Sequence, residues 1–304
     1  MTEPIRDVEL HGPLPQLDAP IMVVMLQGWI DAAGAANDAM SAIESQIDPL
    51  PLVTFDPDVF MDYRARRPTM EIRDGRNNGI DWPSIDLYAG KDLQGRDVVI
   101  LRGHEPDSAW NRFSVAVRTL AQHLNITMMV GMGAYPFPTP HTRPSNLSCT
   151  TPTVELLSKV PFIRSTVDVP AGMTAVLEQV LHDSGIPSIS IWAQVPQYLP
   201  GMTYPAASMA LLEGLRTVAG LHFETGSLEH EAVIQSERLN RLVARNPEHA
   251  EMVTKLEAAY DALSPTGDGS RLNNAVPMSE SDIPSADELA AELEAFLRDA
   301  NPEV

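Results

Sequence analysis

The sequence predicts an α/β protein in which helices cover both faces of a mainly parallel β-sheet. Continuous apolar runs, such as residues 21–26 and 126–130, are typical of strands that are buried on both faces. Segments with helical periodicity lie between such runs, as in residues 107–124. This alternation favours parallel strands joined by crossover helices. The chain has 304 residues, 44% of them hydrophobic, which is enough for one large domain with an appendage.

The elements of this α/β part follow one another along the first 225 residues. Asp31 and Asp107 precede two of the helices and are candidate N-caps, because a carboxylate accepts hydrogen bonds from first-turn N–H groups. The predicted strands are residues 21–26, 52–55, 85–88, 97–101, 126–130, 162–167 and 188–195, with a turn at 91–95 joining the third to the fourth. The predicted helices are residues 32–47, 107–124, 173–182 and 206–221.

The pattern changes after Gly226. Two charged amphipathic helices, 228–245 and 247–263, are interrupted at Asn246-Pro247 and predict a helical hairpin. Residues 264–284 are rich in Pro, Gly, Ser, Asn and Asp and predict a linker, and Ser285 to Glu288 fit a capping box that opens a last helix. The predicted organisation is a sandwich domain over residues 1–225, a helical hairpin over 226–263, a linker over 264–284 and a C-terminal helix and tail over 285–304.

The charge of the chain excludes several classes of partner. The formal net charge is −20, and it is uneven: residues 1–223 carry 24 acidic and 15 basic side chains, whereas residues 224–304 carry 17 and 6. Nucleic acids and anionic membranes would be repelled, so neither is expected as a partner. The single cysteine permits no intramolecular disulfide, and the N-terminus is polar rather than signal-like. We therefore expect a cytoplasmic protein.

The turn after residue 26 is the first candidate ligand site. Gly28, Trp29 and Asp31 lie where a strand gives way to a helix, and backbone N–H groups at such a turn attract anions. Ligands of parallel α/β folds usually lie at this carboxyl edge of the sheet. The Asp31 carboxylate would compete with an anion, so the alternative is a capped helix with a glycine for close packing.

The turn after residue 101 is the second candidate. His104 and Glu105 could act as a general acid–base pair or as metal ligands. One histidine and one carboxylate are too few for a metal site, and the structural alternative is a helix start capped by Asp107. We expect no bound metal.

The proline-rich segment 131–144 is the most informative part of the chain. Four prolines in nine residues fix φ and remove backbone donors, which predicts a stiff loop that cannot continue the sheet. Such a loop would present Tyr135, His141, Thr142 and Arg143 for recognition. The Arg143 guanidinium could hold a carboxylate or phosphate in two hydrogen bonds. Alternatively, Arg143 pairs with a neighbouring acid and braces the loop.

Two further features have open interpretations. The most basic patch of this acidic chain could bind an anion or pair with acids across a subunit interface, and we favour an interface that includes Tyr63, Arg64 and Arg67, with Asp56 and Arg66 beside them. Cys149 could be a nucleophile only beside a base, so a buried, inert thiol is the simpler interpretation. No phosphate-binding loop, dinucleotide fingerprint or nucleophile elbow is present in the sequence, so no cofactor is expected.

Several short segments, taken together and in order, resemble the proteasome assembly chaperone 2 family in its long actinobacterial form. Each is short, but they span residues 20–220. The segments are Gly28-Trp29-Ile30-Asp31-Ala32, Asp62-Tyr63-Arg64-Ala65-Arg66-Arg67-Pro68, Gly103-His104-Glu105-Pro106-Asp107 with Trp110, Tyr135-Pro136-Phe137-Pro138-Thr139-Pro140-His141-Thr142-Arg143-Pro144, Gly172-Met173-Thr174-Ala175, and Trp192-Ala193-Gln194-Val195-Pro196-Gln197-Tyr198.

The resemblance implies a three-layer α/β/α sandwich related to the nucleoside phosphorylase and hydrolase fold, with a helical C-terminal extension. It also implies a homo-oligomer, with a trimer as the expected form. Eukaryotic and archaeal relatives act as chaperones for proteasome α-subunits, which makes proteasome subunits the expected partners. Some of those relatives use a C-terminal hydrophobic-Tyr-x tail, whereas this chain ends Asn301-Pro302-Glu303-Val304.

Three functions remain open from the sequence. The first is a non-catalytic cytoplasmic binding or assembly protein. The second is a phosphorylase-like or hydrolase-like enzyme for a small anionic substrate, in which Arg143 holds the anion, His141 or Glu105 moves a proton, and Trp29 or Tyr135 stacks on the substrate. The third is an oligomeric scaffold with a vestigial pocket. Both active functions require Trp29, Glu105 and His141 to share one rim of the molecule.

Overall fold

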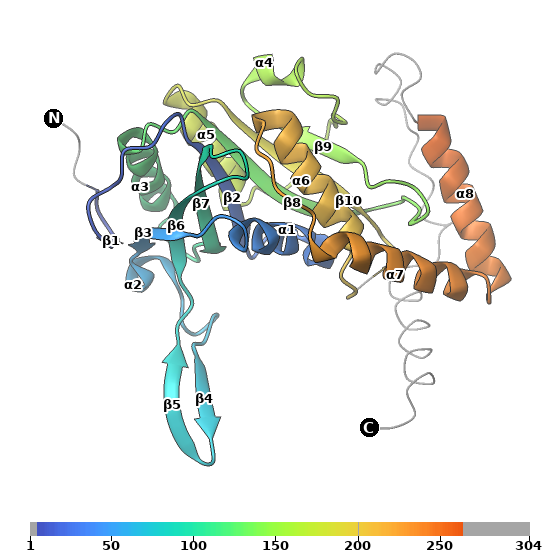
Figure 1. Ribbon diagram of the computed structural model, residues 1–304, viewed down its shortest axis with the longest axis horizontal. Helices are drawn as coiled ribbons and strands as arrows, with labels where there is room; N and C mark the ends of the chain where they lie inside the picture. The colour runs from blue at the N-terminus through green and yellow to red at the C-terminus, as the bar shows by residue number, and fades with distance from the viewer. Residues whose placement is uncertain (1–4, 200, 264–304) are drawn as a thin grey trace.

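The fold is a mixed sheet of eight strands, described here from a computed structural model over residues 5–199 and 201–263 (Figure 1). The strand order across the sheet is β1-β3-β6-β7-β2-β8-β10-β9. The strands are β1 (Val8–Leu10), β2 (Ile21–Gln27), β3 (Leu50–Phe55), β6 (Ile85–Lys91), β7 (Asp97–His104), β8 (Met128–Phe137), β9 (Leu147–Thr150) and β10 (Ser188–Pro196).

The middle of the sheet is parallel, as the sequence predicts. Strands β7, β2, β8 and β10 are neighbours and run in one direction. The outer strands β1, β3, β6 and β9 pair in the antiparallel sense. Only residues 92–96 join β6 to β7, a connection that is too short for a crossover and therefore makes this pair antiparallel.

Helices cover both faces of the sheet (Figure 1). One face packs against α1 (Ala35–Glu44) and α6 (Pro205–Ala219), and the other against α3 (Trp110–His123) and α5 (Met173–Asp183). The side chains of β2 alternate between the two cores, because successive residues of a strand point to opposite faces. This confirms the three-layer α/β/α arrangement.

The chain continues past α6 into α7 (Ser227–Val243) and α8 (Pro247–Leu263), close to the predicted bounds. The two helices diverge from the break at Asn246-Pro247 (Figure 1). Shorter helical segments are η1 (Ala32–Gly34), α2 (Pro57–Phe60) and α4 (Val154–Leu157). The predicted linker and last helix, residues 264–304, lie outside the described residues.

Two strand predictions were wrong. Strand β8 continues through Pro136 to Phe137, because it pairs with β2 only as far as Gly131 and, after an isolated bridge between Ala134 and Asp31, needs hydrogen bonds on its β10 side alone. The predicted strand 162–167 is not a strand. Its place beside β10 is taken by β9, and only Ile163 forms an isolated bridge, to Ser148.

Of the two predicted N-caps, Asp31 is confirmed and Asp107 was wrong. The carboxylate of Asp31 accepts hydrogen bonds from the N–H groups of Ala36 and Asn37 at 2.8 and 3.0 Å, so it caps α1 across the intervening turn. Asp107 does not cap α3. That helix begins after Ala109, whose φ of 56° turns the chain into it, and the Asp107 carboxylate binds Arg66 instead.

A hairpin of β4 (Thr69–Arg73) and β5 (Arg76–Asp81) extends away from the sandwich (Figure 1). The sequence analysis missed it. Asp74 and Gly75, both with positive φ, form its tight turn. An Asp-Gly pair that follows the alternating apolar residues Met70 and Ile72 is a strong hairpin signal and would have predicted it.

A buried carboxyl group lies between α5 and the edge of the sheet. Glu178 is only 5% exposed, and the hydroxyl of Thr150 donates a hydrogen bond to its Oε1 at 3.0 Å. Burial raises the pKa of Glu178 to about 7, although the hydroxyl groups of Ser190 and Thr150 act in the opposite direction. The folded protein therefore keeps this proton at pH values where an unfolded glutamate has lost it.

This difference predicts that the free energy of unfolding falls as pH rises. Between the ordinary glutamate pKa of 4.5 and the folded value of about 7, Glu178 alone should remove about 3 kcal/mol. Glu178→Gln cannot ionise, so urea unfolding at several pH values should show a smaller decrease than the wild type. The exposed Glu155→Gln is the control, and an unchanged pH dependence in Glu178→Gln would contradict the prediction.

Candidate functional site

The structure brings four sequence segments together at the carboxyl ends of β2 and β7. We call this group the strand-end site and define it as Gly28, Trp29, Arg66, His104, Glu105, Asp107 and Gly172. Gly28 and Trp29 follow β2, and His104 and Glu105 end and follow β7, which is the neighbouring parallel strand. Parallel strands therefore explain why residues about 75 positions apart are neighbours.

Glu105 connects β7 to helix α5. Its backbone N–H donates to the carbonyl of Gln27 at 2.6 Å, which fixes the loop beside β2. Its carboxylate accepts a hydrogen bond from the backbone N–H of Met173, the first residue of α5. A helix N-terminus favours negative charge, and here the protein's own carboxylate occupies that position.

Arg66 joins the predicted basic patch to the strand-end site. Its Nε lies 3.1 Å from Oδ1 of Asp107, and its Nη1 lies 3.3 Å from Nδ1 of His104. Burial lowers the pKa of His104, and the neighbouring positive charge of Arg66 lowers it further. A neutral His104 accepts this hydrogen bond at Nδ1, so the three side chains form one hydrogen-bonded group.

Trp29 and Gly172 are in close contact. A Cβ atom built on Gly172 would lie 2.9 Å from Cδ1 of Trp29 and 3.2 Å from Oε1 of Glu105. The indole ring is 38% exposed, so it covers the backbone at the start of α5 and also faces solvent. A glycine is therefore required at residue 172 for this packing.

His141, Thr142 and Arg143 belong to a different group, which we call the helix clamp. Arg143 donates from Nε and Nη2 to the two carboxylate oxygens of Asp261, each at 2.8 Å, and from Nη1 to Glu257 at 3.2 Å. Thr142 also donates to Glu257. Both acids lie on α8, so these contacts attach the last described helix to the proline-rich segment.

His141 is buried at the base of the helix clamp. Its backbone N–H donates to the hydroxyl oxygen of Tyr198 at 2.7 Å, and the same hydroxyl lies 2.7 Å from the ring Nδ1. Burial lowers the pKa of His141, while Asn240 and Glu257 oppose that shift. The ring is 7% exposed, so it supports the packing of the clamp.

The remaining candidates make other contacts. Tyr135 accepts a hydrogen bond from Gln194 at 2.9 Å and packs edge-to-face against Phe137. Tyr63 packs against Trp82 at the base of the hairpin, with Arg64 and Arg67 exposed beside it. Cys149 is buried on β9, and burial raises the pKa of its thiol.

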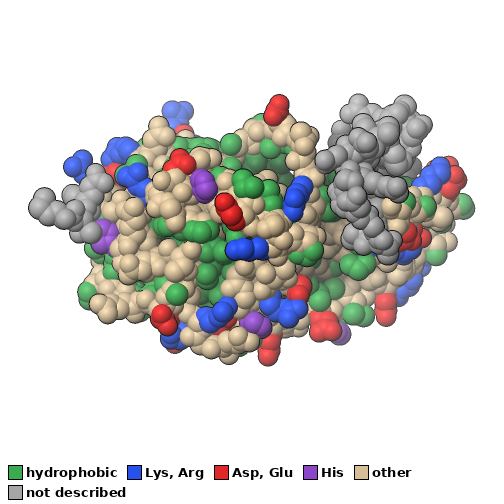
Figure 2. Space-filling view, turned by 90° about the horizontal axis from the view of Figure 1, so that it is seen from above, with side chains coloured by type: hydrophobic (Ala, Val, Ile, Leu, Met, Phe, Trp, Pro, Cys, Tyr) green, Lys and Arg blue, Asp and Glu red, His purple; other side chains and the backbone are tan. Residues whose placement is uncertain are grey.

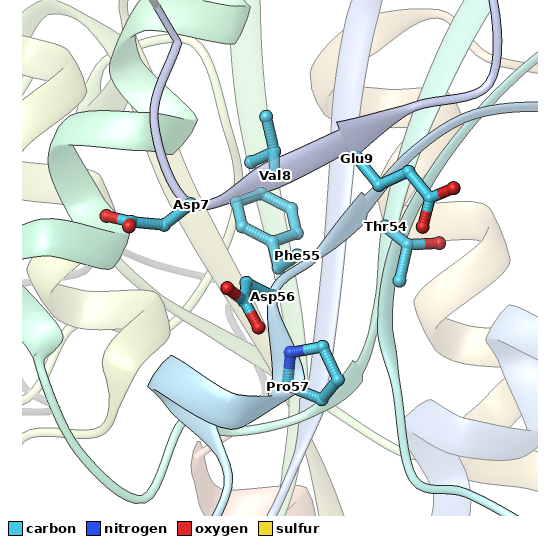
Figure 3. Close-up of a pocket in the computed structure, with 7 residues that line it drawn as sticks. All are labelled: Asp7, Val8, Glu9, Thr54, Phe55, Asp56 and Pro57. Carbon is cyan, nitrogen blue, oxygen red and sulfur yellow. The ribbon is translucent and has the colours of Figure 1, made fainter.

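Two surface pockets, each of about 370 Å³, include Asp56 in the first and Gly103 in the second, but none of the predicted ligand-binding residues. The first is lined by residues of β1 and β3, including three acids that point in different directions (Figure 3). Asp7 of this pocket binds Arg112, and Asp56 caps α2. In the described part of the chain, no cluster of three or more His, Cys, Asp or Glu side chains is arranged to hold a metal ion.

A comparison with models of known protein families finds a match that covers both groups of residues. The model of the PAC2 family matches residues 25–243. The chain belongs to the PAC2 family. That match includes the whole strand-end site and the proline-rich half of the helix clamp, and it ends at the last residue of α7. No curated protein matches the chain.

Several solved structures share this fold. A Mycobacterium tuberculosis protein of unknown function, Rv2714, has 33% identity and a TM-score of 0.76 over 84% of this chain and 89% of its own. The proteasome-assembly chaperone homologue Rv2125 of Mycobacterium tuberculosis has 28% identity and a TM-score of 0.71 over 77% and 99%. The archaeal proteasome activator PbaB of Pyrococcus furiosus has 17% identity and a TM-score of 0.60 over 77% and 97%, which shows a common fold.

None of the helices in the described ranges has the length and apolar content needed to cross a bilayer. The sequence analysis had named Arg66, but it did not predict its contacts with His104 and Asp107. It also missed the partners of the helix clamp, which are Tyr198, Glu257 and Asp261. Nothing in the spacing of these residues links them, because they are brought together only by the folded chain.

The contact between Trp29 and Gly172 can be tested with Gly172→Ala. The backbone at residue 172 has φ −86° and ψ 172°, which alanine adopts freely, so the effect is steric. The indole must shift, and we expect a loss of about 1–3 kcal/mol in the free energy of unfolding together with a changed tryptophan fluorescence spectrum. The neighbouring Ala171→Ser should change neither, and a wild-type spectrum for Gly172→Ala would refute the contact.

The helix clamp predicts a local effect of Arg143→Ala. Without the guanidinium, Glu257 and Asp261 lose their shared partner, so amide hydrogen exchange in α8 should become faster while exchange in β2 stays the same. Arg241→Ala is a matched control, since its partner Glu237 lies on the same helix α7. Equal α8 exchange in the two variants would show that the clamp does not hold the helix.

Proposed function

We propose that this protein is a non-catalytic cytoplasmic binding protein that assists the assembly of a proteasome or a related protein complex. The observation that carries this proposal is its membership of the PAC2 family, together with its similarity to a proteasome-assembly chaperone homologue over 77% of the chain. The expected partners are proteasome subunits. A chaperone of this kind binds its partner through surface contacts and needs no reaction chemistry.

The contacts of the candidate residues support a binding function over an enzymatic one. Arg143 would have to leave both Asp261 and Glu257 before it could hold an anionic substrate. Glu105 is bound to the start of α5, and His141 is enclosed beside Tyr198. These side chains hold elements of the fold together. An enzyme would instead keep such groups available to its substrate.

Exposed apolar side chains near the strand-end site offer a surface for a protein partner. Ile30 is 42% exposed beside Trp29, and Val169, three residues before Gly172, is 64% exposed. Figure 2 looks down on the α4 side of the molecule, away from the hairpin of β4 and β5, and on that face too hydrophobic side chains lie between charged ones. Exposed aromatic and aliphatic groups with a polar surround are typical of protein interfaces.

The test uses purified proteasome α-subunits of the source organism and the full-length protein. We expect the wild type to bind them and to accelerate ring formation, measured by native mass spectrometry. A double variant, Ile30→Ser with Val169→Ser, should bind at least about tenfold more weakly, because apolar anchors at an interface contribute more than 1 kcal/mol each. Val233→Ser, an exposed apolar position on α7, is the control.

Two results would overturn the proposal. One is a wild-type protein that binds none of the organism's proteasome subunits and leaves their assembly rate unchanged. The other is a double variant that binds as tightly as the control, which would remove the strand-end surface from the interface.

A further inference from the structure

The second surface pocket is a feature that the proposed function does not use. Its volume of about 370 Å³ lies within the range of small-molecule sites. Gly103 lines it one residue before His104 of the strand-end site. We call it the α1 pocket, and the side chains that line it belong to Glu44, Pro49, Ser84, Asp86, Tyr88 and Arg102.

The strands β6 and β7 supply the polar side chains of the α1 pocket. Asp86 and Tyr88 are two residues apart on β6, and Leu87 between them is buried in the core on the opposite face of the sheet. The two polar side chains therefore share the face that carries α1. Arg102 of β7 is the direct cross-strand neighbour of Asp86, so a cation and an anion enter the pocket side by side.

These two neighbours do not neutralise each other. In the described part of the chain, the guanidinium of Arg102 forms its ion pair with Glu44, the last residue of α1. Its Nη2 also lies 3.4 Å from Oδ1 of Asn37 and 3.3 Å from Oγ of Ser41 on the same helix. The positive charge of the pocket is therefore already matched by an acid of α1.

Asp86 is held by hydroxyl groups instead. The hydroxyl of Thr54 donates to its Oδ1 at 2.6 Å, and the hydroxyl of Ser84 donates to its Oδ2 at 2.5 Å. The Thr54 oxygen in turn lies 2.8 Å from Nε2 of His11. Within the described ranges no basic side chain forms an ion pair with this carboxylate, and each of its oxygens keeps a further lone pair for another donor.

The charge balance selects the kind of ligand. Glu44 and Asp86 against Arg102 leave one negative charge, and this charge lies on Asp86. An anion would first have to displace Glu44 from the guanidinium. A calcium ion needs six to eight oxygen ligands, which one free carboxylate does not supply.

A primary ammonium group fits the free acceptors. It carries three N–H donors, which match the remaining lone pairs of Asp86 and the hydroxyl oxygens of Ser84 and Tyr88. Burial raises the pKa of Tyr88, and the charge of Asp86 raises it further, so the phenol stays neutral beside the carboxylate. Pro49 and the tyrosine ring provide apolar walls for the body of such a molecule.

We propose that the α1 pocket binds a small organic cation through a primary ammonium group, with Asp86 as its counter-ion. The ion pair of Glu44 and Arg102 forms the opposite wall and keeps the guanidinium away from Asp86. The net charge of −20 favours this ligand, because an acidic protein raises the concentration of cations at its surface.

The test is isothermal titration calorimetry of the full-length chain with butylammonium chloride at low ionic strength, so it involves no proteasome subunit. We expect saturable binding at one site. Butan-1-ol has the same alkyl chain without the charge, and tetramethylammonium has the charge without N–H donors, so both should bind at least about tenfold more weakly. Absence of saturable binding, or equal binding of butan-1-ol or tetramethylammonium, would overturn the proposal even without any variant.

A variant locates the site. Asp86→Asn should raise the dissociation constant of butylammonium at least about tenfold, because the amide removes the charged acceptor. The exposed Asp168→Asn removes the same charge outside the pocket and is the matched control, with wild-type affinity expected. Equal affinities of the two variants would show that the amine binds elsewhere.

Discussion

The burial of four parallel strands on both faces is the constraint on which the rest of this structure depends. Met22, Val23 and Val24 of β2 are consecutive and fully buried, although their side chains point to alternate faces of the sheet. The strands beside β2 also carry consecutive buried residues. Such a sheet needs a helix layer on each side. Each connection between two parallel strands must also cross one face of the sheet, and the crossing segment is usually a helix. The carboxyl ends of the strands then lie along one edge, where their loops are neighbours.

At two places along that edge, side-chain contacts attach helices to the loops that follow the strands. In the strand-end site, Glu105 connects β7 to α5 through a single backbone N–H, and Arg66 ties the segment after α2 to the start of α3. In the helix clamp, Arg143 connects the end of β8 to α8 through two carboxylates. Both groups resemble recognition sites in composition, because the same charge-assisted hydrogen bonds serve ligand binding and internal bracing.

The sequence was informative where local physics decides the structure. Long apolar runs identified β2, β7, β8 and β10, and periodicity identified α3, α5, α6, α7 and α8. The sequence was misleading where a neighbouring strand of the sheet decides the structure. Pro136 remains in β8 because only one neighbour needs hydrogen bonds there, and residues 162–167 are not a strand because β9 already occupies the edge. For the candidate site, the residue types were found, but the partners that engage His141 and Arg143 were not, because Tyr198 lies 57 residues and Asp261 118 residues along the chain.

The lone thiol provides an internal reporter of motion at the sheet edge. Cys149 is the only cysteine in the chain, and it lies on the outermost strand β9, 7% exposed against β10. An alkylating reagent reaches a buried thiol when the structure around it opens, so the labelling rate of the unmodified protein measures how often this part of the sheet edge opens. Edge dynamics can thus be followed by mass spectrometry, with no engineered probe and no background from other sulfhydryl groups.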